Sequence, residues 1–231
     1  MVVAAPEEAT DRRRELIGIA CVLISALALS LKGILAKFIF AEGVDVATLL
    51  AIRYTLTLPM LVVVALWLKG GATALRMPWR DFGLGAVGGL IGYYVAGLLD
   101  FTALEMIDVS VERVLLFSFP VFVLLLDGLR RRRPPPRRQI LALILGEAGI
   151  IMVMGVTDPA IFFANLEGGL FAIASAFAFA IYFMMNQSLG PRLGSARMAL
   201  AAVAGATLGI DLHFVAFASF DSLAMSGTAW L

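Results

Sequence analysis

The sequence predicts an all-α integral membrane protein with seven transmembrane helices. Of its 231 residues, 61% are hydrophobic and only 15% are charged, and the mean hydropathy is +0.95. One soluble core cannot bury that much apolar surface. Apolar runs of about 17–25 residues, which suit a ~30 Å hydrocarbon core, cover residues 16–40, 46–68, 82–104, 110–129, 140–156, 168–187 and 198–219.

The distribution of Lys and Arg predicts how these helices are oriented. Residues 130–138 read Arg-Arg-Arg-Arg-Pro-Pro-Pro-Arg-Arg between two apolar runs, and such basic loops stay in the cytoplasm. Counting crossings from this loop makes the N-terminus and residues 69–81 and 188–197 cytoplasmic as well. These segments carry fourteen of the eighteen Lys and Arg residues, and the opposite loops carry none. We expect an integral protein of a bacterial inner (plasma) membrane with a cytoplasmic N-terminus.

The first run resembles a signal peptide at its start but is interpreted as a transmembrane helix. Residues 16–40 follow Arg12–Arg14 as a signal peptide would, but the run is too long for one and is interpreted as an uncleaved helix.

Pro59 in the second run and Pro120 in the fourth lie near mid-span, where each removes a backbone hydrogen bond. They are either tolerated bends or the helix kinks that transporters use near the midplane.

The third run is expected to lie at the centre of the bundle because its glycines form small-xxx-small pairs, which let another helix approach closely in lipid. These glycines are Gly85, Gly88, Gly89 and Gly92. The same stretch matches the letters of a dinucleotide fingerprint, but it does not follow a strand, so that interpretation is rejected.

Charged residues lie in the outer half of several spans, where each needs a partner or a cavity. The bases are Lys32, Lys37, Arg53 and Arg113, and the acids at the same level are Asp100, Glu105, Asp108 and Glu112. One interpretation is a neutralised structural layer, with Lys37 reaching the membrane interface. The other is an outer gate whose ion pairs break and re-form, with Arg113 paired to Asp100 or Glu105 and Arg53 paired to another member of the layer. The deepest bases, Lys32 and Arg53, suit an anionic substrate group.

Other side chains are candidates for a substrate cavity or for coupling. Glu147 lies near the centre of the fifth run, so it is either a hydrogen-bonded structural residue or a proton-coupling group. Tyr93 and Tyr182 are either ordinary packing residues or orient a small solute in a cavity through their hydroxyl groups. Asp211 and His213 in the seventh run are expected to partner other helices.

A short internal similarity suggests an inverted repeat. Gly18–Ala26 resembles Gly168–Ala176 at an offset of 150 residues, and the predicted topology sends these two helices in opposite directions.

The chain resembles the EamA branch of the drug/metabolite transporter superfamily. The likeness rests on Ser25–Lys37 with Arg53, on Ala103–Ser110 with Phe119–Phe122, and on Gly146–Gly155. It implies ten helices in two inverted five-helix repeats, both termini cytoplasmic, around a substrate cavity. We accordingly expect a cytoplasmic tail (residues 1–15), a first repeat (16–157) and the start of a second, inverted repeat (168–231) that lacks its last three helices.

The function expected from these features is a secondary transporter that exports small organic metabolites by alternating access. The alternative is an incomplete, non-transporting membrane fragment or scaffold. A membrane-embedded enzyme is disfavoured because one His and one Cys cannot build the usual metal or nucleophile constellations. We expect no catalytic residue, metal, cofactor or nucleic-acid partner. The expected partners are a small-molecule substrate, the lipid bilayer, and either a second copy or the missing helices.

Overall fold

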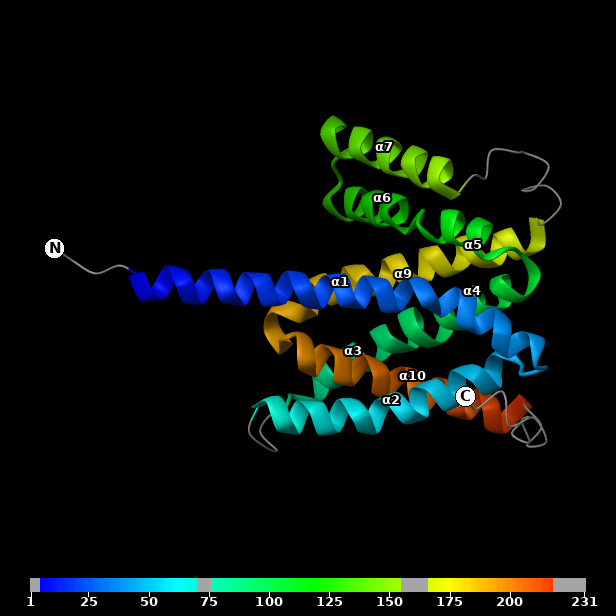
Figure 1. Ribbon diagram of the computed structural model, residues 1–231, viewed down its shortest axis with the longest axis horizontal. Coiled ribbons are helices and arrows are strands. Elements are labelled where there is room, and N and C mark those ends of the chain that lie inside the picture. The colour runs from blue at the N-terminus through cyan, green and yellow to red at the C-terminus, as the bar shows by residue number, and fades with distance from the viewer. Residues whose placement is uncertain (1–4, 70–75, 155–165, 218–231) are drawn as a thin grey trace.

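The computed structural model describes residues 5–69, 76–154 and 166–217, which form helices joined by short turns, without a strand among them. The helices lie roughly along the long axis of one bundle (Figure 1). In chain order they are α1 (Ala5–Ala41), α2 (Val46–Lys69), α3 (Trp79–Gly89), the π-helix η2 (Leu90–Val95), α4 (Ala96–Met106), α5 (Val109–Leu116), α6 (Phe119–Arg131), α7 (Arg137–Met154), α9 (Leu166–Leu193) and α10 (Ser195–Phe217).

The predicted all-α membrane fold is confirmed. Within the described residues, six stretches are long and apolar enough to cross a bilayer, namely Glu15–Ala41, Val46–Trp67, Trp79–Met106, Val109–Arg131, Leu166–Leu193 and Ser195–Phe217. The third consists of α3, η2 and α4 in succession, and the fourth of α5 and α6. The predicted span at 140–156 falls on α7, whose 18 residues include Arg137, Arg138 and Glu147. Residues 155 and 156 lie outside the described part.

The basic loop is shorter than the sequence predicts. α6 continues to Arg131 and α7 begins at Arg137, so four of the six arginines belong to helix ends. Arg132 adopts a left-handed conformation with φ of 52°, which lets the amide of Arg133 bond the carbonyl of Gly128 at 3.1 Å and close the last turn of α6. α6 therefore ends two residues later than the predicted span, shortly before the three prolines.

Figure 1 shows how the helices are ordered around α9 and α10. α9 packs against α4, α5 and α6, whereas α10 packs against α2 and α3. α1 and α9 run in opposite directions, as the inverted-repeat hypothesis requires. The N-terminal end of α1, the C-terminal end of α2 and the α6–α7 and α9–α10 turns lie at one end of the bundle. The basic segments therefore share one side.

Glycines bring the third span into close contact with α9 and α10. A Cβ added to Gly89 would lie 1.8 Å from the carbonyl oxygen of Ala202 in α10, and one added to Gly92 would lie 2.2 Å from the ring of Tyr182 in α9. Larger residues cannot fit between these backbones. The predicted central glycines are buried, namely Gly85, Gly88, Gly89 and Gly92.

Two spans change their helical geometry partway. The third passes through the π-helix η2, and the hydroxyl of Tyr54 in α2 donates to the carbonyl of Tyr93 there at 3.0 Å. Such π segments are frequent at functional sites. The fourth span breaks between Leu116 and Phe119, and Pro120 lies in the first turn of α6, where its missing N–H costs no intrahelical bond. Pro59, by contrast, lies inside the continuous helix α2.

Polar side chains connect the helices across the bundle. The hydroxyl of Ser175 in α9 donates to the carbonyl of Ala96 in α4 at 2.7 Å. The predicted interhelical partners of the last span are present, because Asp211 accepts from the Thr55 hydroxyl at 3.1 Å and His213 Nδ1 lies 2.8 Å from the hydroxyl of Tyr94. In a bilayer these bonds hold helices together where apolar burial cannot.

Candidate substrate cavity

A central cavity of about 270 Å³ lies where α1, α2, η2, α4, α5, α6 and α9 meet. Its size is at the lower end of small-molecule sites. Apolar and aromatic side chains form most of the wall, with basic and acidic groups concentrated in one part of it. The lining residues are Leu29, Lys32, Arg53, Tyr54, Gly92, Tyr93, Ala96, Gly97, Asp100, Phe101, Arg113, Leu116, Phe117, Phe119, Ser175 and Phe179.

An ion pair joins α1 to α4 at this cavity. The ammonium group of Lys32 contacts Oδ2 of Asp100, and both side chains are largely buried, with 21% and 5% exposed. The same ammonium lies 4.6 Å from the centre of the Phe101 ring, where a cation–π attraction adds to the ion pair. Lys32 was predicted as a cavity residue and Asp100 as an ion-pair residue, and the structure brings both to the same wall.

A second ion pair lies beside the first. Nε of Arg113 is 3.1 Å from Oε2 of Glu112, whose side chain is fully buried. Oδ1 of Asp100, both carboxylate oxygens of Glu112 and Nη2 of Arg113 are buried without a well-oriented hydrogen-bond partner, and the carboxyl groups of Asp100 and Glu112 lie within hydrogen-bonding reach of each other. Gly33 in α1 makes room for the guanidinium, since a Cβ there would lie 3.0 Å from Nη2. Several strongly polar atoms at this cavity therefore have unused bonding capacity.

Arg53 in α2 contributes a third cation. Its guanidinium lies 5.2 Å from the ring centre of Tyr54 and 5.8 Å from that of Phe101. It is exposed, and among the described residues no carboxylate lies within ion-pair distance of it. Aromatic faces attract the guanidinium without neutralising it.

Three tyrosines connect the cavity wall. The hydroxyl of Tyr182 in α9 donates to the hydroxyl of Tyr93 in η2 at 3.0 Å, and the Tyr93 ring stacks on Tyr54 with ring centres 6.3 Å apart. Tyr93 lines the cavity, as predicted. Tyr182 does not line the cavity. Its hydroxyl instead bonds the hydroxyl of Tyr93 and helps to hold the Tyr93 ring in position.

The predicted pairing within the charge layer is wrong in part. Arg113 pairs with its own neighbour Glu112 and not with Asp100 or Glu105, because Lys32 from α1 reaches Asp100. Lys37 and Glu105 form no ion pair within the described chain and do not line the cavity. The layer therefore divides into an inner cluster, made of Lys32, Arg53, Asp100, Glu112 and Arg113, and more peripheral charges.

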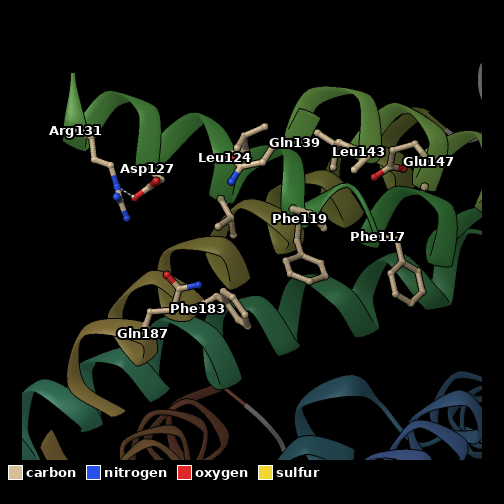
Figure 2. Close-up of a pocket in the computed structure, with 14 residues that line it drawn as sticks. Phe117, Phe119, Leu124, Asp127, Arg131, Gln139, Leu143, Glu147, Phe183 and Gln187 are labelled. Atoms are coloured by element: carbon tan, nitrogen blue, oxygen red, sulfur yellow. Dashed lines mark hydrogen bonds and ion pairs between the residues drawn. The ribbon is translucent and has the colours of Figure 1, made fainter. Parts of the chain in front are cut away.

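A larger cavity of about 720 Å³ forms a groove between α6, α7 and α9. Figure 2 shows the ion pair of Arg131 and Asp127 at one end of it and Glu147 toward the other. Glu147 has no hydrogen-bond or ion-pair partner within the described residues, so the structure does not provide the partner that a structural role would require. The groove is larger than the central cavity, but the buried charges are concentrated in the central cavity.

Phe117 and Phe119 line both the groove and the central cavity. They flank the break between α5 and α6, and Phe119 also packs edge-on against Phe179 of α9 with ring centres 5.3 Å apart. These two rings therefore form the partition between the cavities. The sequence gives one signal for it, Pro120, but does not identify the aromatic partition itself.

Comparison with known proteins places these features in context. Residues 16–155 match the model of the EamA-like transporter family. The chain is 25% identical over 195 residues to a protein of Bacillus subtilis (strain 168) named "Uncharacterized transporter YcbK", an alignment that covers 83% of this chain and 61% of that relative. A solved structure described as "Crystal structure of protein" matches with a TM-score of 0.62 at 22% identity, covering 94% of this chain and 71% of the other. That likeness supports the fold alone.

Proposed function

Because the chain belongs to the EamA-like transporter family, whose model matches residues 16–155, we propose that it is a secondary transporter that moves a small organic metabolite through the central cavity. The observation that carries this proposal is a small cavity lined by unsatisfied charged groups within membrane-spanning helices. Ionisable groups at membrane depth are costly and usually mark a transport pathway. Lys32, Arg53 and Tyr93 are the proposed substrate contacts, with Tyr182 supporting Tyr93.

The proposed mechanism is alternating access around the break between α5 and α6. Phe117 and Phe119 separate the central cavity from the groove that ends at Asp127 and Arg131. A modest rotation of α6 about the break would move these rings and connect the two spaces. The outer side would be gated by the Lys32–Asp100 and Glu112–Arg113 pairs, which can separate when α1 moves.

The proposed direction is export across a bacterial inner membrane, with the N-terminus in the cytoplasm. The arginine-rich end of the bundle is then cytoplasmic, and the groove gives substrate an entrance from that side. Cysteines introduced at Pro135 and Asp108, in a Cys21→Ala background, test the orientation. An impermeant thiol reagent should label Pro135→Cys only from the cytoplasm and Asp108→Cys only from the other side; the reverse pattern contradicts this orientation.

The chain spans about 61% of the length of the curated relative that it matches. Its activity, substrate and partners are therefore proposals about the whole transporter. The proposed partners are a small-molecule substrate, the lipid bilayer and either a second copy of the chain or further helices. The alternative function is a non-transporting fragment or scaffold, and the flux experiment below separates the two.

Gly97 offers a direct test because it lines the cavity, and a Cβ added there has its nearest neighbour, the Tyr54 hydroxyl, 3.6 Å away. Gly97→Val should fill part of the cavity without a backbone clash. Gly83→Val is the matched control, since no atom lies within 4 Å of its added Cβ.

The experiment measures uptake of radiolabelled amino acids, organic acids and amines into proteoliposomes that contain the 231-residue chain. Saturable uptake of at least one solute, abolished by Gly97→Val and retained by Gly83→Val, supports transport through this cavity. Absence of flux for every solute, with folded protein in the membrane, supports the non-transporting alternative.

A further inference from the structure

The inner cluster carries more positive than negative charge. Lys32, Arg53 and Arg113 are the bases, and Asp100 and Glu112 are the only acids that accompany them in the cluster. Each carboxylate has one basic partner, so in formal charges the bases outnumber the acids by one. In the low dielectric of a membrane protein, an uncompensated charge strongly attracts an ion of opposite sign.

Within the described residues, Arg53 is the cation of this cluster that has no acidic partner. Lys32 contacts Asp100, and Arg113 contacts Glu112 through Nε, whereas Arg53 meets only the faces of Tyr54 and Phe101. Arg53 lines the cavity and is classed as an exposed residue. A guanidinium presents several N–H donors in a plane, a geometry that suits a carboxylate.

The helices around the cluster supply no other acid for Arg53 within the described residues. On α4, Glu105 does not line the cavity, and Asp108 lies just before α5. On α10, which packs against α2, Asp211 accepts a hydrogen bond from Thr55. The counter-charge must therefore come from outside these helices.

We infer that the central cavity binds a small organic monoanion, with its negative group on the guanidinium of Arg53. This inference rests on the proposed transport function and specifies its substrate class. The anion would compensate the excess positive charge of the cluster, and Arg113 places a second cationic side chain in the same wall.

The remaining walls favour an apolar body on this anion. Tyr54, Tyr93, Phe101, Phe119 and Phe179 surround the space, and its volume is about 270 Å³. Aromatic faces bind flat apolar groups well, and the size excludes large solutes. A carboxylate attached to one ring is thus a suitable probe.

The test compares benzoate with its neutral and cationic counterparts, benzamide and benzylamine. Equilibrium dialysis measures each radiolabelled compound against the 231-residue chain in nanodiscs at neutral pH, with empty nanodiscs subtracted. Saturable benzoate binding is expected, with the other two compounds binding about tenfold or more weakly. Equal binding of benzamide or benzylamine, or no saturable benzoate binding at millimolar concentrations, would overturn the inference.

Substitutions at Arg53 test whether its positive charge holds the carboxylate of benzoate. Arg53→Gln should weaken benzoate binding by about tenfold or more, and Arg53→Lys should weaken it less than Arg53→Gln, because it keeps the charge but loses the planar set of donors. Arg80→Gln is the matched control, since Arg80 is exposed and lines neither the groove nor the central cavity. Unchanged binding in Arg53→Gln, with an elution profile like that of the parent chain, would contradict the assignment. Equal competition by chloride would assign the site to an inorganic anion and would also overturn it.

The same preparations separate this inference from the proposed function. Charge-selective benzoate binding that depends on Arg53, without flux in proteoliposomes, supports the anion site and contradicts transport by this chain. Saturable flux of a neutral or cationic solute that is unaffected by Arg53→Gln supports transport and contradicts the anion site.

Discussion

Lys32 and Asp100 form an ion pair between α1 and α4 although they are 68 residues apart in the sequence. Both side chains are largely removed from solvent, and the Asp100 carboxyl group also lies within hydrogen-bonding reach of Glu112. Removing one member of a buried pair leaves the other charge uncompensated, which is far more costly than losing an exposed pair. Among the described residues, this is the ion pair that links α1 to another helix, so it should matter for the position of α1.

The first prediction concerns this pair. Lys32→Gln should destabilise the folded chain by about 3–5 kcal/mol, because it leaves the Asp100 carboxylate buried and unpaired. Arg131→Gln, which breaks the exposed pair with Asp127, should cost only about 0.3–0.5 kcal/mol. Thermal unfolding in detergent compares the two, and the double exchange Lys32→Asp with Asp100→Lys should recover part of the loss. Equal melting temperatures for Lys32→Gln and Arg131→Gln would contradict this prediction.

A second prediction follows from the close approach of α3 and α10. Gly89→Ala places a Cβ 1.8 Å from the carbonyl oxygen of Ala202, so the helices must separate and stability should fall by about 1–3 kcal/mol or more. Gly83→Ala adds the same atom in the same helix, where nothing lies within 4 Å, and should be neutral or slightly stabilising. Thermal unfolding measures both variants. A Gly89→Ala variant as stable as Gly83→Ala would show that α3 and α10 are not packed as described.

A third prediction concerns the aromatic partition. Phe119→Ala removes a ring that lines both cavities and should connect them. In proteoliposomes we expect faster downhill movement of a transported solute and weaker accumulation against a gradient. Phe122→Ala is a control of equal volume change, since Phe122 packs on Phe177 and lines neither of these two cavities. If both variants behave alike, Phe119 is a packing residue and not part of a gate.

A fourth prediction tests Glu147 as the proton-coupling residue. Glu147 lines the groove and has no hydrogen-bond or ion-pair partner within the described residues, so it is available to exchange a proton with water entering the groove. Glu147→Gln should abolish the stimulation of flux by a pH gradient while sparing exchange of labelled for unlabelled substrate, which needs no proton movement. Glu105→Gln is the control at a peripheral carboxyl group. Retained pH-gradient stimulation in Glu147→Gln would exclude this role.

The membrane fold was predictable because the features that determine it can be recognised in the sequence without knowing which helices pack together. Apolar length and the placement of arginines predict spans and their common ends, and the small-xxx-small glycines predict that the third span is central. Gly89 and Gly92 illustrate this, since both lie against another helix. These signals depend on composition and spacing and not on which helices become neighbours.

The details of the site were less predictable because they depend on those neighbours. The depth of each residue in its predicted span grouped Arg113 with Asp100. It could not show that Lys32 on α1 is the base that contacts Asp100. The π-helix η2 and the partition by Phe117 and Phe119 also depend on packing that leaves no local pattern. Arg53 was identified as a cavity residue from its depth, but its lack of an acidic partner became visible only in the structure.

The central claim is that the cavity at Gly97 is the transport site and opens alternately to each side of the membrane. The most direct measurement uses Gly97→Cys in a Cys21→Ala background, reconstituted in proteoliposomes of known orientation and treated with an impermeant thiol reagent from one side at a time. Gly97 lines the cavity and has room for a Cβ, so the thiol should be accommodated. The account predicts labelling from either side, slowed by a bound substrate such as benzoate. Labelling from one side only, at a rate that benzoate does not change, would contradict it.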